Sequence, residues 1–216
     1  MATRALLAEL CAEFTARTGV AVAIESVGGV DAARRVAQGE RFDVVVLASD
    51  AIDRLLAAGH LVAPRVDVVR SPVAVAVPAG RDAPAISDRD ALLAALRAAP
   101  RIGVSTGPSG VTLLQRLADW GLDRLVAERC VQAPPGVPVA TLLARGDVDL
   151  GFQQLSEMLG APGIRILGPL PDDVAIVTTF SAAAPAPVGP DVDALLRFFT
   201  DPQTAAAKRR HGMSPA

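Results

Sequence analysis

The 216-residue chain is poor in aromatic residues and contains no tyrosine. Phe and Trp together make up only 3% of the sequence. Proteins that bind nucleic acids or sugar rings commonly stack them on aromatic side chains, so the shortage argues against both ligand classes. The 21 basic and 23 acidic residues nearly balance, without the basic stripe that would bind DNA or an anionic membrane. We therefore expect a small-molecule ligand and no nucleic acid.

Cysteine and histidine are equally scarce, with two residues of each. Neither Cys11 nor Cys130 stands in a CxxC or Cys/His cluster with zinc spacing. Cys11 falls on the apolar face of a predicted helix, which favours a buried thiol. His60 and His211 stand near the ends of predicted helices, a position more typical of structural than of catalytic histidines. We expect no metal and no cofactor.

Long apolar runs are missing as well. No stretch approaches the ~18 uninterrupted apolar residues of a membrane helix, so we expect no membrane insertion. The first 14 residues, MATRALLAELCAEF, contain three charged side chains where a secretory signal needs an unbroken apolar segment. As written, the sequence predicts a cytoplasmic monomer. A longer native N-terminus would make the protein periplasmic.

What the sequence does have is a regular alternation of helix and strand patterns. We predict a helix over residues 4–18 closed by Gly19, a strand over 20–27, and a buried strand from Phe42. Asp50 is the expected N-cap of the helix that follows that strand. Strands that alternate with helices indicate parallel sheets with covered faces.

Two longer strand patterns interrupt this alternation, at residues 68–77 and 175–180. We interpret them as strands that cross between two α/β lobes. A helix-rich end, PDVDALLRFFTDPQTAAAKRRHG, follows the second crossing and supplies one or two closing helices.

The order of these elements resembles the type II periplasmic binding proteins, and among them the molybdate-type binding proteins. Three segments carry the resemblance: FDVVVLASDAIDRL, DVDLGFQQLSE and AAAKRRHGMSPA. It covers nearly the whole chain and implies an α/β fold of two lobes, each a mostly parallel sheet flanked by helices, with the ligand cleft between the lobes. On that template lobe one comprises residues 1–75 and 178–216, and lobe two comprises residues 76–177.

The chain departs from the family in two respects. Molybdate-type proteins begin with a strand, whereas this chain begins almost on its first helix, and we expect the natural start to lie upstream of Met1. Gly28, Gly29 and Val30 stand where the family places hydroxyls, and Gln153 and Gln154 stand near the position of a ligand-binding Tyr. The family's hydroxyls and its Tyr are both sources of neutral hydrogen-bond donors, and both are replaced here. We therefore expect a ligand other than molybdate.

The stretch IGVSTGPSGVTLLQRLADWGL, residues 102–122, carries the strongest local signal for a ligand. Small polar residues lead from a strand into a helix, whose first turn offers unpaired N–H groups and partial positive charge to an anion. The stretch lacks the Gly-Lys-Ser/Thr ending of a P-loop, so ATP is not expected. The hydroxyls of Ser105, Thr106 and Ser109 and the N–H groups of Gly110 and Val111 are the predicted donors.

The remaining candidates lie elsewhere in the chain. Arg4 at the first helix, with Thr3, and Arg70 near the first crossing could bind a carboxylate. Successive strand residues point to opposite faces, and we choose Gln154 over Gln153 as the one that faces the ligand. The ligand-binding set is thus Thr3, Arg4, Gly28, Gly29, Val30, Arg70, Ser105, Thr106, Ser109, Gly110, Val111 and Gln154.

Two functions fit this set. The first is a binding protein that closes on a small oxyanion or carboxylate, in the family a component that feeds an ABC importer. The alternative is isomerisation of a small polycarboxylate by allylic proton transfer, since aconitate isomerase resembles the same fold. Such an enzyme needs a general base, and Asp31 and Asp50 are the only carboxylates expected near the cleft. The absence of an evident acid/base pair favours the binding protein.

Overall fold

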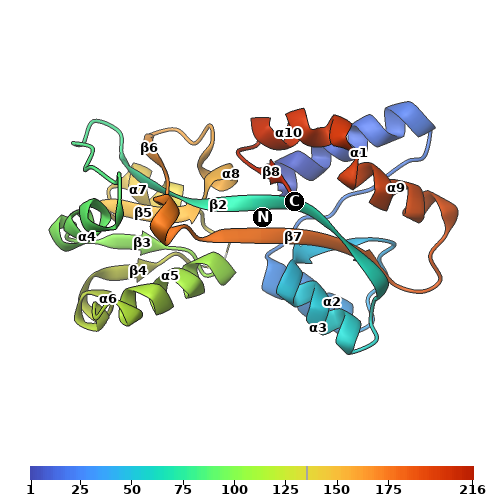
Figure 1. The fold of residues 1–216 in the computed structure, drawn as a ribbon, viewed down its shortest axis with the longest axis horizontal. Helices are drawn as coiled ribbons and strands as arrows, with labels where there is room; N and C mark the ends of the chain where they lie inside the picture. Colours follow the sequence, from blue (N-terminus) through green and yellow to red (C-terminus); the bar gives the residue numbers. More distant parts are fainter. Residues whose placement is uncertain (135) are drawn as a thin grey trace. The chain divides into compact units, whose positions relative to one another are not determined.

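The computed structural model describes residues 1–134 and 136–216, which form two compact units (Figure 1). Unit 1 consists of Met1–Ser71 and Thr178–Ala216, and unit 2 of Pro72–Val177. The mixed α/β fold class predicted from the sequence is confirmed. Among the described residues, none of the helices is long and apolar enough to cross a bilayer.

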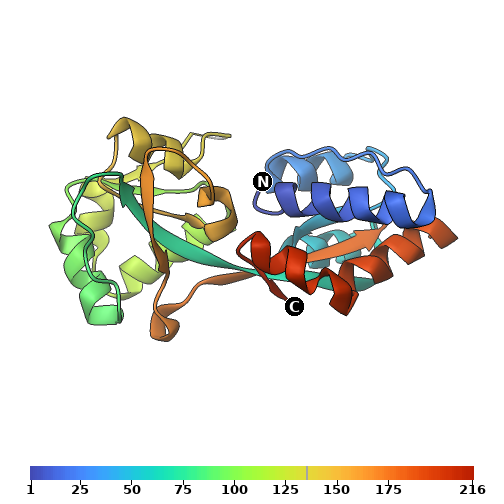
Figure 2. The ribbon, with the colours of Figure 1, turned by 90° about the horizontal axis from the view of Figure 1, so that it is seen from above.

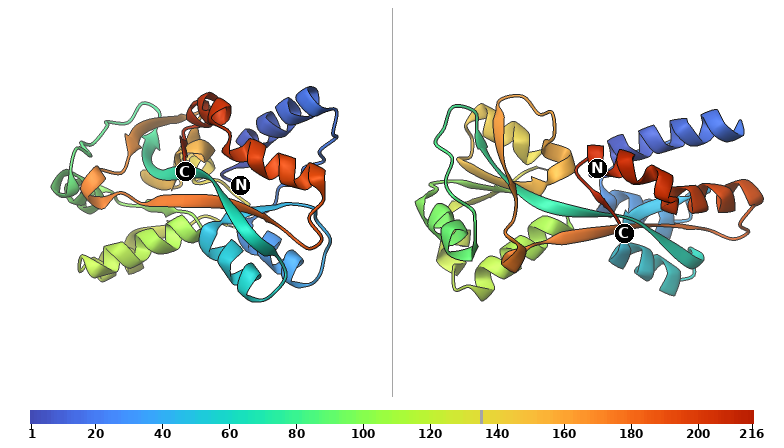
Figure 3. Two further views of the ribbon diagram at one scale, coloured as in Figure 1. Left: turned by 45° about the vertical axis from the view of Figure 1, so that its right-hand side comes forward. Right: turned by 45° about the horizontal axis from the view of Figure 1, so that its top comes forward.

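Unit 1 has a small sheet covered by helices from both ends of the chain. Helix α1 packs against α9 and α10 (Figures 2 and 3), and the ion pair of Glu9 with Arg210 fastens the first helix to the last. Cys11 is buried in this core, and burial raises the pKa of its thiol to about 11. The elements are α1 (Arg4–Thr18), α2 (Gly29–Ala37), β1 (Val45–Ala48), α3 (Ser49–Ala57), the first part of β2 (Val62–Pro78), β7 (Val177–Ala184), α9 (Pro190–Thr200), a 3₁₀ turn (Pro202–Thr204), α10 (Ala205–Arg210) and β8 (Ser214–Pro215).

Unit 2 is built on a mixed sheet in which β3 pairs in parallel with both β4 and β5. The second part of β2 adds antiparallel pairs with β5 and β6. Apolar cores lie on both sides of the sheet, one under α4 and α5 and one under α7. The elements are α4 (Arg89–Ala98), β3 (Ile102–Val104), α5 (Pro108–Asp119), α6 (Asp123–Arg129), β4 (Cys130–Gln132), α7 (Val139–Arg145), β5 (Leu150–Gln154), α8 (Leu155–Met158), β6 (Ile164–Pro169) and a 3₁₀ turn (Asp172–Val174).

The chain passes between the units twice, within β2 at Ser71 and Pro72 and at the start of β7. The predicted crossings, residues 68–77 and 175–180, overlap these two strands. The expectation of a mostly parallel sheet does not hold in unit 1, where β1 pairs with β7 and β2 with β8 in antiparallel register. Strand β7 enters from the other unit and runs against β1, so the crossing accounts for that antiparallel pair, whereas β8 is a short strand that follows α10.

The prediction of a strand over residues 20–27 is wrong, because this segment forms no backbone hydrogen-bond ladder with another strand in the structure. Val20 and Val22 pack on the core of unit 1, which explains the alternating apolar pattern. A ladder also requires a neighbour for the N–H and C=O groups, and no described strand pairs with this segment. Alternation of apolar residues indicates that one face of a segment is buried. It does not indicate that a neighbouring strand is present to form backbone hydrogen bonds with it.

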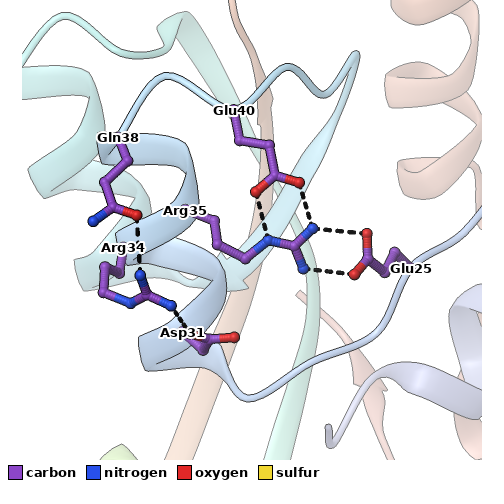
Figure 4. A network of polar contacts seen from close by, with 6 residues as sticks. All are labelled: Glu25, Asp31, Arg34, Arg35, Gln38 and Glu40. Carbon is purple, nitrogen blue, oxygen red and sulfur yellow. Dashed lines mark hydrogen bonds and ion pairs between the residues drawn. The ribbon is translucent and has the colours of Figure 1, made fainter.

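A half-buried arginine holds the segment in place instead (Figure 4). Arg35 on α2 donates from both terminal nitrogens to Glu25, at 2.6 and 2.9 Å, and from Nε to Glu40 at 2.6 Å. These hydrogen bonds lower the pKa of both carboxyl groups. Beside them Arg34 pairs with Asp31 and donates to Gln38. The charge network thus fixes the chain that leads into the start of α2.

The helix ends test two predictions about capping. Helix α1 ends at Gly19 as predicted, with φ at 76° and its N–H on the Thr15 carbonyl. Asp50 is not the N-cap of α3, because the helix already begins at Ser49 and Asp50 pairs with Arg54 at 2.8 Å. The Ser49 hydroxyl donates to the carbonyl of Thr179 in β7 at 2.8 Å, which ties the helix start to the sheet.

In unit 2, side chains of α7 fill the space beside two neighbouring glycines of the sheet. Gly103 in β3 and Gly151 in β5 are register partners. A Cβ atom at Gly103 would lie 2.9 Å from Val139 Cγ1, and one at Gly151 would lie 2.7 Å from Leu143 Cδ1 and 2.8 Å from Val139 Cγ1. Only glycine permits this approach, which sets the position of the first turn of α7.

We expect Gly151→Ala to lower the free energy of unfolding by about 1–3 kcal/mol, because the added methyl group overpacks the contact with α7. Thermal unfolding followed by circular dichroism measures the effect, at about 2–4 °C per kcal/mol for a chain of this size. Gly189→Ala is the matched control, since nothing lies within 4 Å of its Cβ position. Equal melting temperatures for the two variants would contradict the packing argument.

Candidate functional site

The carboxyl ends of three parallel strands meet at one edge of unit 2. Val104, the last residue of β3, is the register partner of Gln132 in β4 and of Phe152 in β5. The loop that follows β3 and the last residues of β5 therefore share this edge. Open α/β sheets bind ligands at the carboxyl ends of their strands.

The loop after β3 turns tightly into α5 at Gly110. A Cβ atom at this position would lie 1.9 Å from the carbonyl oxygen of Ser105, so only glycine permits the turn. The hydroxyls of Ser105 and Ser109 consequently lie 3.4 Å apart, with Ser109 buried. Thr106 is exposed between them. The structure thus brings the three predicted hydroxyl residues into one short loop at the strand edge.

The N–H groups predicted to serve as donors in this loop require a correction. Those of Gly110 and Val111 both donate to the Gly107 carbonyl, at 3.0 and 3.2 Å, and belong to the first turn of α5. Pro108 has no N–H, so the amide of Ser109 is the donor of this turn that has no acceptor among the described residues. The anion-binding character predicted for the helix start shifts from residues 110 and 111 to residue 109.

Gln153 and Gln154 are both buried at the end of β5 and lie on opposite faces of the sheet. The side-chain oxygen of Gln153 accepts the Val139 N–H at 2.8 Å, at the first turn of α7. Its amide group donates to the carboxylate of Glu157 on α8. The choice of Gln154 as the ligand-facing residue stays a prediction, and Gln153 acquires a role that sequence reasoning did not assign.

Glu157 is the group at this edge that sequence reasoning missed. Burial raises the pKa of its carboxyl group above the ordinary value, and the hydrogen bond from Gln153 offsets part of that shift. The Oγ atom of the neighbouring Ser156 is buried and has no hydrogen-bond partner among the described residues. In the sequence, Glu157 is one charged residue in a short helical stretch. Only its position four residues beyond Gln153, at the end of a buried strand, could have marked it.

Unit 1, taken by itself, has candidate donors at the starts of two helices. Thr3 is the buried N-cap residue of α1, and Arg4 is exposed in its first turn. At the start of α2, Ala32 N–H donates to the Gly28 carbonyl, so the preceding amides at Gly29 and Val30 have no acceptor in the helix. The Val30 side chain is 75% exposed. Nothing lies within 4 Å of the Cβ position at Gly28, and Leu47 Cδ2 lies 3.9 Å from that of Gly29.

The two arginines predicted to bind the ligand, Arg4 and Arg70, are exposed, and neither forms an ion pair with any described residue. Arg41 and Arg209 of the same unit also lack one, whereas Arg35, Arg54 and Arg65 are paired. Arg70 lies in β2 opposite Ser214. The next residue, Ser71, is fully buried, and its hydroxyl has no partner within the described chain.

The donors of the two units share one chemistry. They are hydroxyls, backbone amides and guanidinium groups, all of which suit a negatively charged ligand. No three His, Cys, Asp or Glu side chains gather into a metal site in the described residues.

Comparison with known proteins agrees with this architecture. The family model of the bacterial extracellular solute-binding proteins matches residues 1–214. Aconitate isomerase from a Pseudomonas species is 35% identical over 188 residues, which cover 84% of this chain and 70% of that enzyme.

Among solved structures, the periplasmic molybdate-binding protein of Azotobacter vinelandii superposes with a TM-score of 0.77 at 23% identity, covering 98% of this chain and 94% of its own. The substrate-binding domain of a putative molybdenum ABC transporter from Clostridium difficile gives the same TM-score at 15% identity, with 100% and 95% coverage. The chain has the fold of the type II periplasmic binding proteins and belongs to the bacterial extracellular solute-binding protein family.

Proposed function

We propose that this protein binds a small carboxylate or comparable oxyanion other than molybdate. The observation that carries the proposal is the start of α5, where the hydroxyls of Ser105 and Ser109 lie 3.4 Å apart at the carboxyl edge of the sheet. Neutral donors at a helix start favour anions, because the partial positive charge of the helix adds to their hydrogen bonds.

The arginines favour carboxylates within the anion class. A guanidinium group binds a carboxylate through two parallel hydrogen bonds, and Arg4 and Arg70 have no ion-pair partner among the described residues. The backbone of Gly28, Gly29 and Val30 offers amides in place of the hydroxyls that we expect of a molybdate site. Closure of two lobes on the ligand, and delivery to an ABC importer if the protein is exported, follow from the family resemblance.

A second function, isomerisation of a small polycarboxylate, is supported by one specific finding. The 35% identity to aconitate isomerase extends over 84% of the chain. The enzyme would use the same anion donors to hold its substrate, so binding of carboxylates is common to both proposals.

Removing the loop hydroxyls should weaken ligand binding and leave the fold intact. We expect the double variant Thr106→Ala, Ser109→Ala to raise the dissociation constant for the best carboxylate by at least tenfold, since a hydrogen bond to a charged group contributes about 1.5–3 kcal/mol. A thermal-shift screen of citrate, cis- and trans-aconitate, sulfate and molybdate selects that probe, and calorimetry measures its affinity.

Thr112→Ala is the control, because the Thr112 hydroxyl already donates to the Pro108 carbonyl of its own helix. If the double variant melts several degrees lower but binds as tightly as the parent, the hydroxyls stabilise the loop and do not contact the ligand.

Neutralising the unpaired arginines should reduce affinity in the same assay. We expect Arg4→Gln and Arg70→Gln each to weaken carboxylate binding by about tenfold or more, through loss of a charge-assisted hydrogen bond. Arg54→Gln is the matched control, since Arg54 is exposed and paired with Asp50. Equal affinities for the three variants would remove both arginines from the site.

A further inference from the structure

A chain of hydrogen bonds in unit 2 ends on a half-buried carboxyl group. The Val139 N–H donates to Gln153, and Gln153 donates to Glu157. Because both amide atoms of Gln153 are used, the amide cannot flip without losing both bonds. Gln153 therefore fixes the position of the Glu157 carboxylate relative to α7 and the strand edge.

Packing and capping do not require this carboxyl group. The Gln153 side chain alone accepts the Val139 N–H at the first turn of α7. The core under this helix is apolar, with Val139, Leu143 and Met158 all buried. Even partial burial of a carboxyl group beside such a core costs free energy, and the raised pKa of Glu157 indicates that the hydrogen bond from Gln153 offsets only part of that cost. Titratable groups held in this way are concentrated at functional sites.

We propose that Glu157 is the group that removes and returns a proton during allylic isomerisation of a small polycarboxylate, with Gln153 as its positioning residue. This inference rests on the second function proposed above, and it supplies the general base that the sequence alone did not reveal.

The reaction requires no oxidant or co-reactant. The Glu157 carboxylate takes a proton from a CH₂ group that lies between a carboxylate and a C=C bond, and the C–H electron pair becomes the new C=C bond. The electron pair of the old C=C bond takes a proton at its far carbon, delivered by the carboxylic acid form of Glu157. One proton leaves and one returns, so the product is an isomer of the substrate.

The local environment suits this role. Burial moves the pKa of Glu157 upward, toward the neutral range where a general base is most effective. The Ser105 and Ser109 hydroxyls at the same strand edge provide donors for a substrate carboxylate as negative charge spreads over it. The buried Ser156 Oγ, without a partner among the described residues, adds a further donor beside Glu157.

The test compares wild type with Glu157→Gln in two assays on the full chain. Proton NMR in D₂O follows the interconversion of cis- and trans-aconitate and the entry of deuterium at their allylic carbons. Calorimetry measures the affinity for each isomer. Glutamine keeps the size of the side chain and an acceptor for Gln153 but cannot take up the proton, so we expect interconversion and exchange to fall at least about 100-fold while affinity changes less than about threefold.

Glu128→Gln is the matched control, since Glu128 is exposed on α6 and paired with Arg124. If Glu157→Gln does not fold, Glu157→Asp keeps the carboxyl group but withdraws it by one methylene, and catalysis should then fall more than affinity.

The outcomes separate this inference from the proposed function. A Glu157→Gln protein that isomerises at the wild-type rate overturns the role of Glu157 and leaves the isomerase standing. A wild-type protein that binds aconitate without interconversion or exchange overturns the inference and leaves carboxylate binding standing. A wild-type protein that binds neither isomer overturns both.

Discussion

The close approach of helix to strand at glycine positions is the constraint on which unit 2 depends. Gly103 and Gly151 let α7 lie against β3 and β5, with Val139 Cγ1 less than 3 Å from where each Cβ would be. That contact places the Val139 N–H against Gln153, and Gln153 in turn holds Glu157. Larger residues at the two glycines would move the helix start and the half-buried Glu157 carboxylate together. Packing and the proposed chemistry are therefore parts of one arrangement.

A glycine also permits a close approach in the loop after β3, where Gly110 lies against the Ser105 carbonyl. The tight turn gathers hydroxyls and a helix start at an edge that already carries the ends of three parallel strands. In unit 1 the corresponding role falls to the starts of α1 and α2, the second of which is fixed by the Arg35 network. Each unit thus presents backbone amides and a few polar side chains, a combination that favours anions over neutral ligands.

Sequence reasoning reached the architecture because alternation and crossings are encoded locally. The rhythm of helices and strands, the cap at Gly19 and the crossing strands β2 and β7 follow from apolar periodicity and from glycine. Sequence reasoning failed where the structure depends on contacts with other residues that the local pattern does not show. Residues 20–27 have a strand pattern but no neighbour, and the amides of residues 110 and 111 bond within their helix. Glu157 could not be singled out, because its partial burial and its hydrogen bond with Gln153 arise from tertiary packing that one sequence does not reveal.

The central claim is that the site selects carboxylates, and calorimetry on the unmodified protein tests it most directly. Tricarballylate, a saturated tricarboxylate that cannot isomerise, should bind with an affinity that weakens as salt concentration rises, because screening reduces the attraction between the ligand and the exposed arginines. Molybdate and the neutral sugar maltose should give no binding heat. Tight binding of maltose or molybdate, with no response to tricarballylate or other carboxylates, would contradict the account.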